Sequence, residues 1–325
     1  METDHFRSPV ASLLDDIKYT LNYVTEGLSE SRKEAIINLK INIKLDYQPG
    51  QLQTPVTILE TKTIKINETY LSYLWTCCYA VIGLNDIYYK KAKLNQLIVT
   101  FGDVPEYKLI MQTLSWGRSL RNEHSLWPSD IPNPLWKDDT ATNANTLLTT
   151  VILFQTLHEI GHLILHSDIA EFILLAKSQL YDKTPEDKRR LYNAEVQADD
   201  YAFDCIKTSG GNPDQMFIKY LGAVISLLTS FYLLDTADTR QGTHPDLDSR
   251  LRSVIRKLDL VDESHQIHMK AICSLGIQLF MALTGAPFEP FELENPDFKT
   301  FEELHNFLFA IIDKMKEDAN KINRR

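Results

Sequence analysis

The chain has 325 residues, with 34 basic and 44 acidic side chains and a formal net charge of −10. Hydrophobic residues make up 44% of the sequence, an ordinary share for a globular protein that is long enough for one or two domains. The acidic balance argues against a protein that binds nucleic acid or anionic lipid by charge. The one notable basic run, residues 188–190, is expected to be a solvated helix face.

The cysteines and the N-terminal residues indicate the compartment. The four cysteines include no C-x-x-C pair, so we expect neither a thiolate zinc site nor a disulfide framework. Residues 1–35 are polar, with acidic side chains and no long apolar core, so we expect no secretory signal. Together these observations favour a reducing, cytoplasmic setting.

A small β-sheet is expected near the N-terminus. Residues 36–47 alternate apolar and polar side chains, which is the period of a half-buried strand. Residues 48–50 (Gln-Pro-Gly) are a turn signal, and residues 55–66 are rich in β-branched side chains. We therefore predict a small antiparallel sheet between residues 36 and 66.

Helices are expected over most of the remaining chain, because the apolar spacing changes from Asn67 onward. Pro185 suits the first turn of one of them, and residues 210–211 (Gly-Gly) end it. The predicted helices cover residues 69–92, 106–122, 142–166, 168–181, 185–208, 213–235, 247–258, 262–284 and 300–321.

The loop at residues 123–137 contains several prolines and two tryptophans, Trp127 and Trp136. Tryptophans in a loop can line a substrate cleft, or they can seal the loop against the core. The sequence leaves both interpretations open.

Three apolar stretches bear on the membrane question: residues 147–165, 220–234 and 271–286. The first is interrupted by polar side chains, and all three fall short of the roughly 20 residues that a spanning helix needs. We interpret them as buried core helices and expect membrane association to be peripheral at most.

A metal-binding pattern lies in the first of these stretches. Residues 158–162 read His-Glu-Ile-Gly-His, an H-E-x-x-H motif. On a helix, residues i and i+4 share one face, so His158 and His162 can bind the same Zn²⁺ ion. Glu159 is not a ligand in this arrangement and takes a proton from the bound water. Because the surrounding residues are apolar, the motif is expected on a buried helix with one polar stripe.

Glu195 is the candidate third ligand, on the helix predicted to begin at Pro185. Asp199 lies four residues further on and shares its face, so it can hydrogen-bond the outer ring nitrogen of a liganding histidine. Ala198 and Ala202 are small, which allows the two helices to approach closely.

Two further residues are candidates near a turn. His244 precedes a predicted helix and can donate a hydrogen bond to the oxyanion of an attacked amide, or it can simply cap or pack. Arg250 can pair with a buried carboxylate and hold this turn against the catalytic helices. His166 lies four residues after His162, and we interpret it as structural or as a support for a ligand.

The order of these motifs resembles that of a known class. HEIGH, then E-x-x-A-D, then T-H-P-x-x-x-x-R-L is the order seen in glutamate-type zincins, the gluzincins. The sequence is more similar to the Lit-type phage-exclusion (abortive-infection) zinc metalloproteases, which also have a long aromatic helix and a loop with W-P before the metal helix. The matching segments here are residues 66–91, 125–134, 158–162, 195–199 and 243–250.

The resemblance implies a zinc endopeptidase with a single Zn²⁺ ion, held by His158, His162 and Glu195. It also implies an intracellular protein substrate, the elongation factor Tu of the host, and a phage-derived peptide as activator. The implied fold is mostly α (α+β): a helical zincin-like catalytic domain with a small N-terminal antiparallel sheet.

Three parts of the chain are expected on this basis. Residues 1–66 form an N-terminal segment with the sheet, packed on the catalytic domain. Residues 67–260 form the zincin core, and residues 261–325 form a C-terminal helical extension.

Two alternatives stay open. One is a regulatory metalloprotease that cuts a repressor, although no DNA-binding module is visible and no nucleic-acid partner is expected. The other is a non-catalytic zincin-like binding protein with a structural metal, and the intact Glu159 argues against it. Because an endopeptidase that is always active would harm its own cell, we also expect latent activity.

Overall fold

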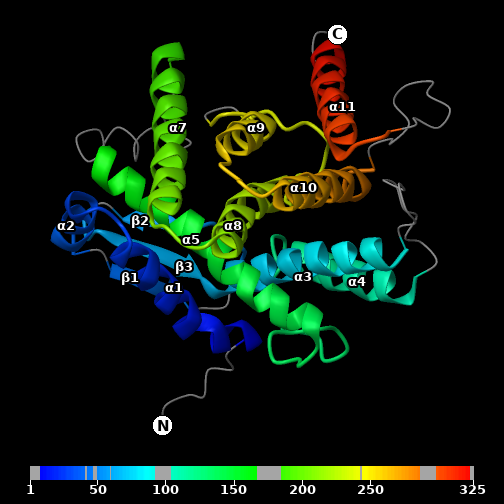
Figure 1. Ribbon diagram of the computed structural model, residues 1–325, viewed down its shortest axis with the longest axis horizontal. Coiled ribbons are helices and arrows are strands. Elements are labelled where there is room, and N and C mark those ends of the chain that lie inside the picture. Colours follow the sequence, from blue (N-terminus) through cyan, green and yellow to red (C-terminus); the bar gives the residue numbers. More distant parts are fainter. Residues whose placement is uncertain are drawn as a thin grey trace.

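The structure is a computed structural model that describes residues 8–40, 42–46, 50–58, 60–91, 104–166, 184–241, 244–285 and 298–322. Helices form most of the described molecule, and a small sheet lies to one side of them (Figure 1). The prediction of a mostly α fold with a small sheet near the N-terminus is confirmed.

The N-terminal part contains short helices followed by three strands. A 3-10 helix, η1 (Pro9–Leu13), leads into α1 (Leu14–Glu26) and α2 (Glu30–Asn38). The strands are β1 (Asn42–Asp46), β2 (Val56–Ile58) and β3 (Thr63–Asn67), in the spatial order β1-β3-β2. The first three residues of the strand predicted over 36–47 are therefore the end of α2.

The sheet is mixed, so the prediction of an antiparallel sheet is wrong for one strand. β2 and β3 are joined by a short turn and pair antiparallel, as a hairpin must. β1 pairs with the other edge of β3 and runs parallel to it. Residues 48 and 49 of the turn predicted at residues 48–50, between β1 and β2, lie outside the described residues.

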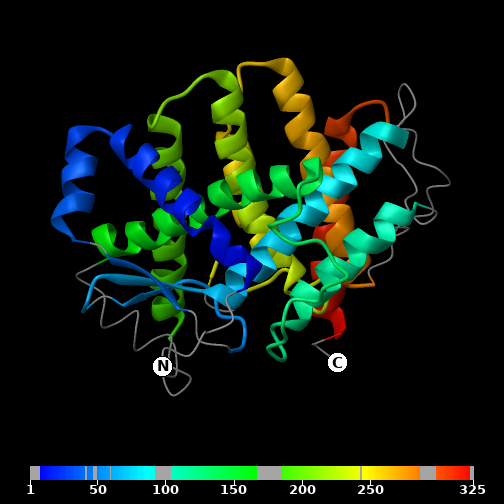
Figure 2. The same ribbon diagram turned by 90° about the horizontal axis from the view of Figure 1, so that it is seen from below.

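Three helices build the core. These are α3 (Glu68–Lys91), α5 (Asp139–Leu165) and α8 (Pro213–Tyr232). Figures 1 and 2 show α5 running through the middle of the molecule, where α1, α3, α7 and α8 pack around it. Because α5 is apolar on nearly every side, this surrounding shell removes most of its side chains from water.

Sequence signals at the helix ends explain where the helices begin. Asp138 accepts a hydrogen bond from the backbone N–H of Ala141, so α5 starts three residues before the predicted Thr142. α7 (Pro185–Thr208) opens with a capping box between Thr184 and Asp187. The remaining helices are α4 (Pro105–Ser119), α9 (Leu247–Lys257), α10 (Glu263–Leu283) and α11 (Phe301–Ile322). The helix predicted at 168–181 lies outside the described residues.

Helices α5 and α7 approach closely where the site lies. A Cβ atom added to Gly161 would come within 3.2 Å of the Cα of Ala198, so only glycine fits this crossing without a shift. Ala198 and Ala202 are fully buried against this contact, as their small size predicted. The close crossing brings polar side chains of the two helices within reach of each other.

Two helices, α5 and α10, are long and apolar enough to cross a membrane by length and composition alone. In α5 83% of the apolar window is buried inside the fold, and in α10 61%. Core helices of a globular protein have the same character, so their apolar sequence is already accounted for by packing.

Trp127 seals its loop against the core. Its ring packs on Trp116 and Trp75, with centroids 4.5 and 5.4 Å away, and its indole N–H donates to the carbonyl oxygen of Pro132. Trp136 is 37% exposed. Neither tryptophan lines the cleft described below, so the sealing interpretation holds for Trp127.

Candidate metal centre

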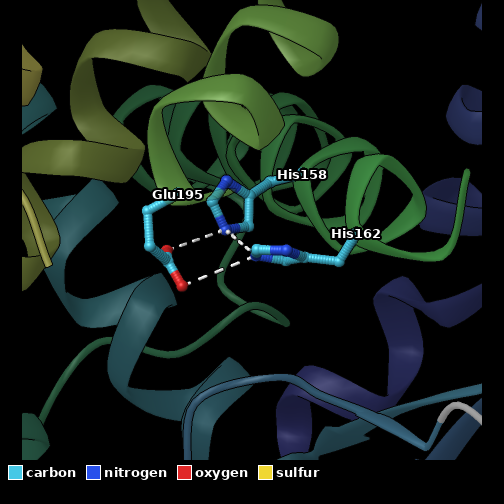
Figure 3. A group of neighbouring side chains, drawn as sticks. All are labelled: His158, His162 and Glu195. Carbon is cyan, nitrogen blue, oxygen red and sulfur yellow. Dashed lines mark hydrogen bonds and ion pairs between the residues drawn. The ribbon is translucent and has the colours of Figure 1, made fainter. Parts of the chain in front are cut away.

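Three side chains from two helices converge at the crossing of α5 and α7. His158 and His162 point from α5 toward the carboxylate of Glu195 on α7 (Figure 3). The two Nε2 atoms lie 3.2 Å apart, and they lie 3.4 and 3.6 Å from the two oxygens of Glu195. All three residues are buried. The structure thus brings together the three ligands that the sequence predicted.

The outer ring nitrogens of both histidines are engaged. His158 donates its Nδ1–H to Asp199 Oδ1 at 2.9 Å. His162 Nδ1 lies 3.0 Å from His166 Nδ1, and His166 Nε2 lies 2.9 Å from the Gln197 side-chain oxygen. An amide oxygen accepts only, so His166 carries its proton on Nε2 and accepts from the Nδ1–H of His162.

These outer bonds leave a site that needs a cation. With the protons on the Nδ1 atoms, the Nε2 lone pairs of His158 and His162 face each other beside a buried carboxylate. Three acceptors without a proton between them repel one another in a buried place. Two imidazole nitrogens and a carboxylate oxygen within 4.8 Å of one another are a donor set that can hold a metal ion.

The neighbouring carboxylates also favour a proton at this place, because a bound proton supplies the same positive charge that a metal ion would. Burial disfavours a charged imidazole, but hydrogen bonds to Asp199 and Glu195 outweigh it and raise the pKa of His158 to about 9. Burial likewise disfavours the Glu195 carboxylate, but hydrogen bonds from His158 and His244 and the nearby imidazoles hold its pKa well below the ordinary value. The site therefore stabilises a negative charge on Glu195 together with a positive charge beside it.

Arg250 balances the charge of Asp199. Its Nε and Nη2 atoms donate to the two oxygens of Asp199, each at 2.7 Å, in a fork-like pair. Despite the burial of the carboxylate, this guanidinium and the His158 hydrogen bond hold the pKa of Asp199 below its usual range. Arg250 is on α9, so the pair also holds the start of that helix against α7, as the sequence predicted.

The candidate base, Glu159, has a partner that the sequence did not predict. The Thr57 hydroxyl of β2 donates to Glu159 Oε2 at 2.5 Å. β2 is an edge strand among the described residues, so α5 lies beside an outer edge of the sheet. Only the tertiary packing of the sheet on α5 brings these two residues together.

His244 reaches the same carboxylate from the segment before α9. Its Nε2 lies 3.4 Å from Glu195 Oε1, and its side chain is 35% exposed. The preceding Thr243 of the T-H-P pattern lies outside the described residues. His244 therefore stands at the mouth of the site, between the metal ligands and solvent.

A lysine of the C-terminal helix holds this segment in place. Lys316 on α11 binds Asp246 at 2.7 Å and Asp248 at 3.0 Å, on either side of the start of α9. Asp248 also accepts from the Thr239 hydroxyl at 2.6 Å. The sequence offered two carboxylates here but no signal of which cation would bind them.

A cleft of about 390 Å³ gives access to the metal ligands. Polar residues of the site line one part of it, including Glu159 and His244. Apolar side chains also line the cleft: Phe154, Leu227, Leu233, Leu234 and Leu247. The cleft can therefore hold a polar reacting group and an adjacent apolar group.

Comparison with known proteins relates the chain to a peptidase family. The model of the peptidase U49 family matches residues 64–270, which include every predicted ligand and both ends of the α5–α7 crossing. The match leaves out β1, β2 with Thr57, and α11 with Lys316. No match was found among the curated proteins or among the solved structures. The family model covers more than half of the chain, and this chain belongs to the peptidase U49 family.

Proposed function

We propose that this peptidase is a zinc-dependent endopeptidase of the gluzincin class. The observation that carries the proposal is the convergence of two imidazole lone pairs and a carboxylate beside a second glutamate, at the base of an open cleft. Two histidines and one glutamate form the ligand set of zinc peptidases that keep a fourth position open. When bound, zinc supplies Lewis-acid chemistry that polarises the scissile carbonyl and lowers the pKa of water.

Glu159 is the general base in this proposal. It lies one residue from His158 on α5 and lines the cleft, so its carboxylate faces the space where water and substrate meet. It takes a proton from the attacking water as the oxygen bonds to the carbonyl carbon. It then gives this proton to the amide nitrogen, which leaves as an amine when the carbon–nitrogen bond breaks.

His244 stabilises the oxyanion that forms on the attacked carbonyl. It stands at the cleft mouth, and Lys316 holds the segment that carries it through Asp246 and Asp248. A fixed hydrogen-bond donor at this place favours the transition state over the ground state.

We propose that an extended substrate binds along the outer edge of β2. Among the described strands β2 pairs only with β3, and the Thr57 hydroxyl of β2 donates to Glu159. Strand addition along this edge aligns a peptide with the base by main-chain hydrogen bonds, while the apolar residues of the cleft receive a side chain.

The test separates metal binding from chemistry. Glu159→Gln is expected to keep zinc and the fold but lose nearly all peptide cleavage, because an amide cannot accept the proton. Zinc content, circular dichroism and cleavage of a proteome-derived peptide library are measured on the same preparation. Wild-type cleavage by Glu159→Gln, or cleavage that a chelator leaves unchanged, overturns the proposal.

For the biological role, we propose phage exclusion in the cytoplasm. The motif order of the Lit-type proteases supports this role, with elongation factor Tu as substrate and a phage-derived peptide as activator. Four buried, free cysteines agree with a reducing compartment. Activity is then latent until the activator binds.

Expression in host cells with and without phage infection tests the role. After infection, mass spectrometry is expected to find new N-termini that arise from cleavage of elongation factor Tu. Equal cleavage and toxicity without infection would refute latency and leave the zinc chemistry standing.

A further inference from the structure

Beyond His244 the cleft continues into a second cavity of about 400 Å³. Gln241 and His244 line both cavities, so a peptide that passes the metal ligands on this side enters the second one. Its wall includes Lys188, Arg189 and Tyr192 of α7, and none of the described residues that line it is aliphatic. The two parts of the cleft thus differ in chemistry, since the first includes several apolar side chains and the described wall of the second is polar and charged.

The spacing of residues along α7 ties this wall to the metal centre. Lys188, Tyr192, Glu195 and Asp199 follow one another at intervals of four, three and four residues, which places them along one face of the helix. Seven residues separate Lys188 from Glu195, a rise of about 10 Å at 1.5 Å per residue. An extended peptide covers this distance with about three residues.

The net charge of the wall is positive. Asp246, its one carboxylate, is bound by Lys316 at 2.7 Å. Arg189 pairs with Glu186 at 2.9 Å, but both side chains are more than half exposed, so water screens this pair strongly. Lys188 is exposed and has no ion pair among the described residues. In a chain of net charge −10, a basic wall beside the cleft is a local exception.

We propose that this cavity is a subsite for an acidic side chain of the peptide substrate, about three residues from the cleaved bond. The subsite rests on the proposed peptidase function and gives it a substrate class. An aspartate or glutamate there meets Lys188 and Arg189 at the wall and the Tyr192 hydroxyl beside them. The basic run that the sequence indicated as a solvated face then has a role in selection.

The first arm of the test is a cleavage profile. The full-length protein is given a proteome-derived peptide library, and the cleaved bonds are mapped by mass spectrometry. We expect about fivefold enrichment of aspartate and glutamate at one position two to four residues from the bond, on one side only. The enrichment should fall between 50 and 500 mM salt, since exposed charges are screened.

Charge reversal identifies the residue. Lys188→Glu should invert the preference, so that lysine and arginine become enriched at the same position. Lys207→Glu is the matched control, because Lys207 is on the same helix, is exposed, and does not line either cavity. It makes the same change in net charge and should keep the wild-type profile.

The second arm does not need catalysis. Library peptides retained on immobilised Glu159→Gln protein are compared with those retained when Lys188→Glu is added. Selective retention of acidic peptides that Lys188→Glu abolishes supports the subsite, even if wild-type protein cuts nothing and the peptidase proposal fails. An acidic preference that survives Lys188→Glu, or no acidic preference in either arm, overturns the subsite.

Discussion

The two histidines of the candidate metal centre are held by different hydrogen-bond partners. His158 donates to Asp199, a buried carboxylate whose charge is balanced by the fork of Arg250. His162 donates to His166, a neutral side chain whose other nitrogen is bound to Gln197. An ion pair thus orients His158, and we call Asp199 and Arg250 the charged side. A chain of neutral hydrogen bonds orients His162, and we call His166 and Gln197 the neutral side.

This difference indicates which of the two sets of contacts also contributes to the stability of the fold. A buried ion pair that loses one partner leaves an uncompensated charge, which costs about 3–5 kcal/mol. A buried neutral hydrogen bond that loses one partner costs about 1–3 kcal/mol. Substitutions among the partners of His158 should therefore lower both zinc affinity and the free energy of unfolding. Substitutions among the partners of His162 should lower mainly zinc affinity.

The largest expected effect is the loss of bound zinc when either histidine is removed. His158→Ala and His162→Ala each remove one of three ligands, so both should lower bound zinc from about one ion per chain to almost none. Glu195→Ala should do the same. Elemental analysis after dialysis measures this, and full zinc in either histidine variant would show that the ligands are assigned wrongly.

The next largest effect tests the charged side. Arg250→Met removes the guanidinium that binds both oxygens of the buried Asp199, and it should lower the free energy of unfolding of the metal-free protein by about 3 kcal/mol. Chemical denaturation followed by circular dichroism gives this value. Lys207→Met, which breaks an exposed pair with Asp259 at 3.2 Å, serves as control and should cost less than about 1 kcal/mol. Equal losses would show that the buried Arg250–Asp199 pair supports the fold no more than an exposed ion pair does.

The sequence could predict the charged side because its residues follow helix spacing. His158 and His162 are four apart, as are Glu195 and Asp199, so a single rule places each pair on one face. Arg250 could be predicted as a partner for a buried carboxylate, since a guanidinium can bind both carboxylate oxygens at once.

Contacts between distant segments could not be predicted in this way. Gln197 lies between two motif positions, off the face that Glu195 and Asp199 share, and only the crossing angle of α5 and α7 brings it to His166. Thr57 and Lys316 reach the site from a strand and a helix far along the chain. The parallel pairing of β1 with β3 is also a long-range choice, which local alternation does not encode.

A smaller effect on zinc binding is expected from His166, which contacts His162 directly. His166→Leu removes the acceptor of the His162 Nδ1–H and should weaken zinc binding about 10-fold, the lower end for a residue that orients a ligand. Competition with a chelator measures the affinity. His166→Gln offers a side-chain carbonyl as a new acceptor and should recover part of it. A His166→Leu protein with unchanged zinc affinity would mean that His162 is oriented by packing alone.

The smallest effect is expected from Gln197, which acts on the metal only through His166. Gln197→Leu removes the acceptor that fixes the His166 proton on Nε2, so His166 can present either tautomer to His162. A neutral hydrogen bond is worth about 0.5–1.5 kcal/mol, and at one remove from the ligand the lower end applies, so zinc affinity should fall about two- to threefold. Gln197→Glu keeps an acceptor oxygen and should restore the tautomer, which nitrogen chemical shifts of the imidazole report directly. Because both residues belong to one chain, adding Gln197→Leu to His166→Leu should cause no further loss of affinity. Additive losses in the double variant would show that Gln197 supports the site by another route, and the neutral side would then be two separate contacts.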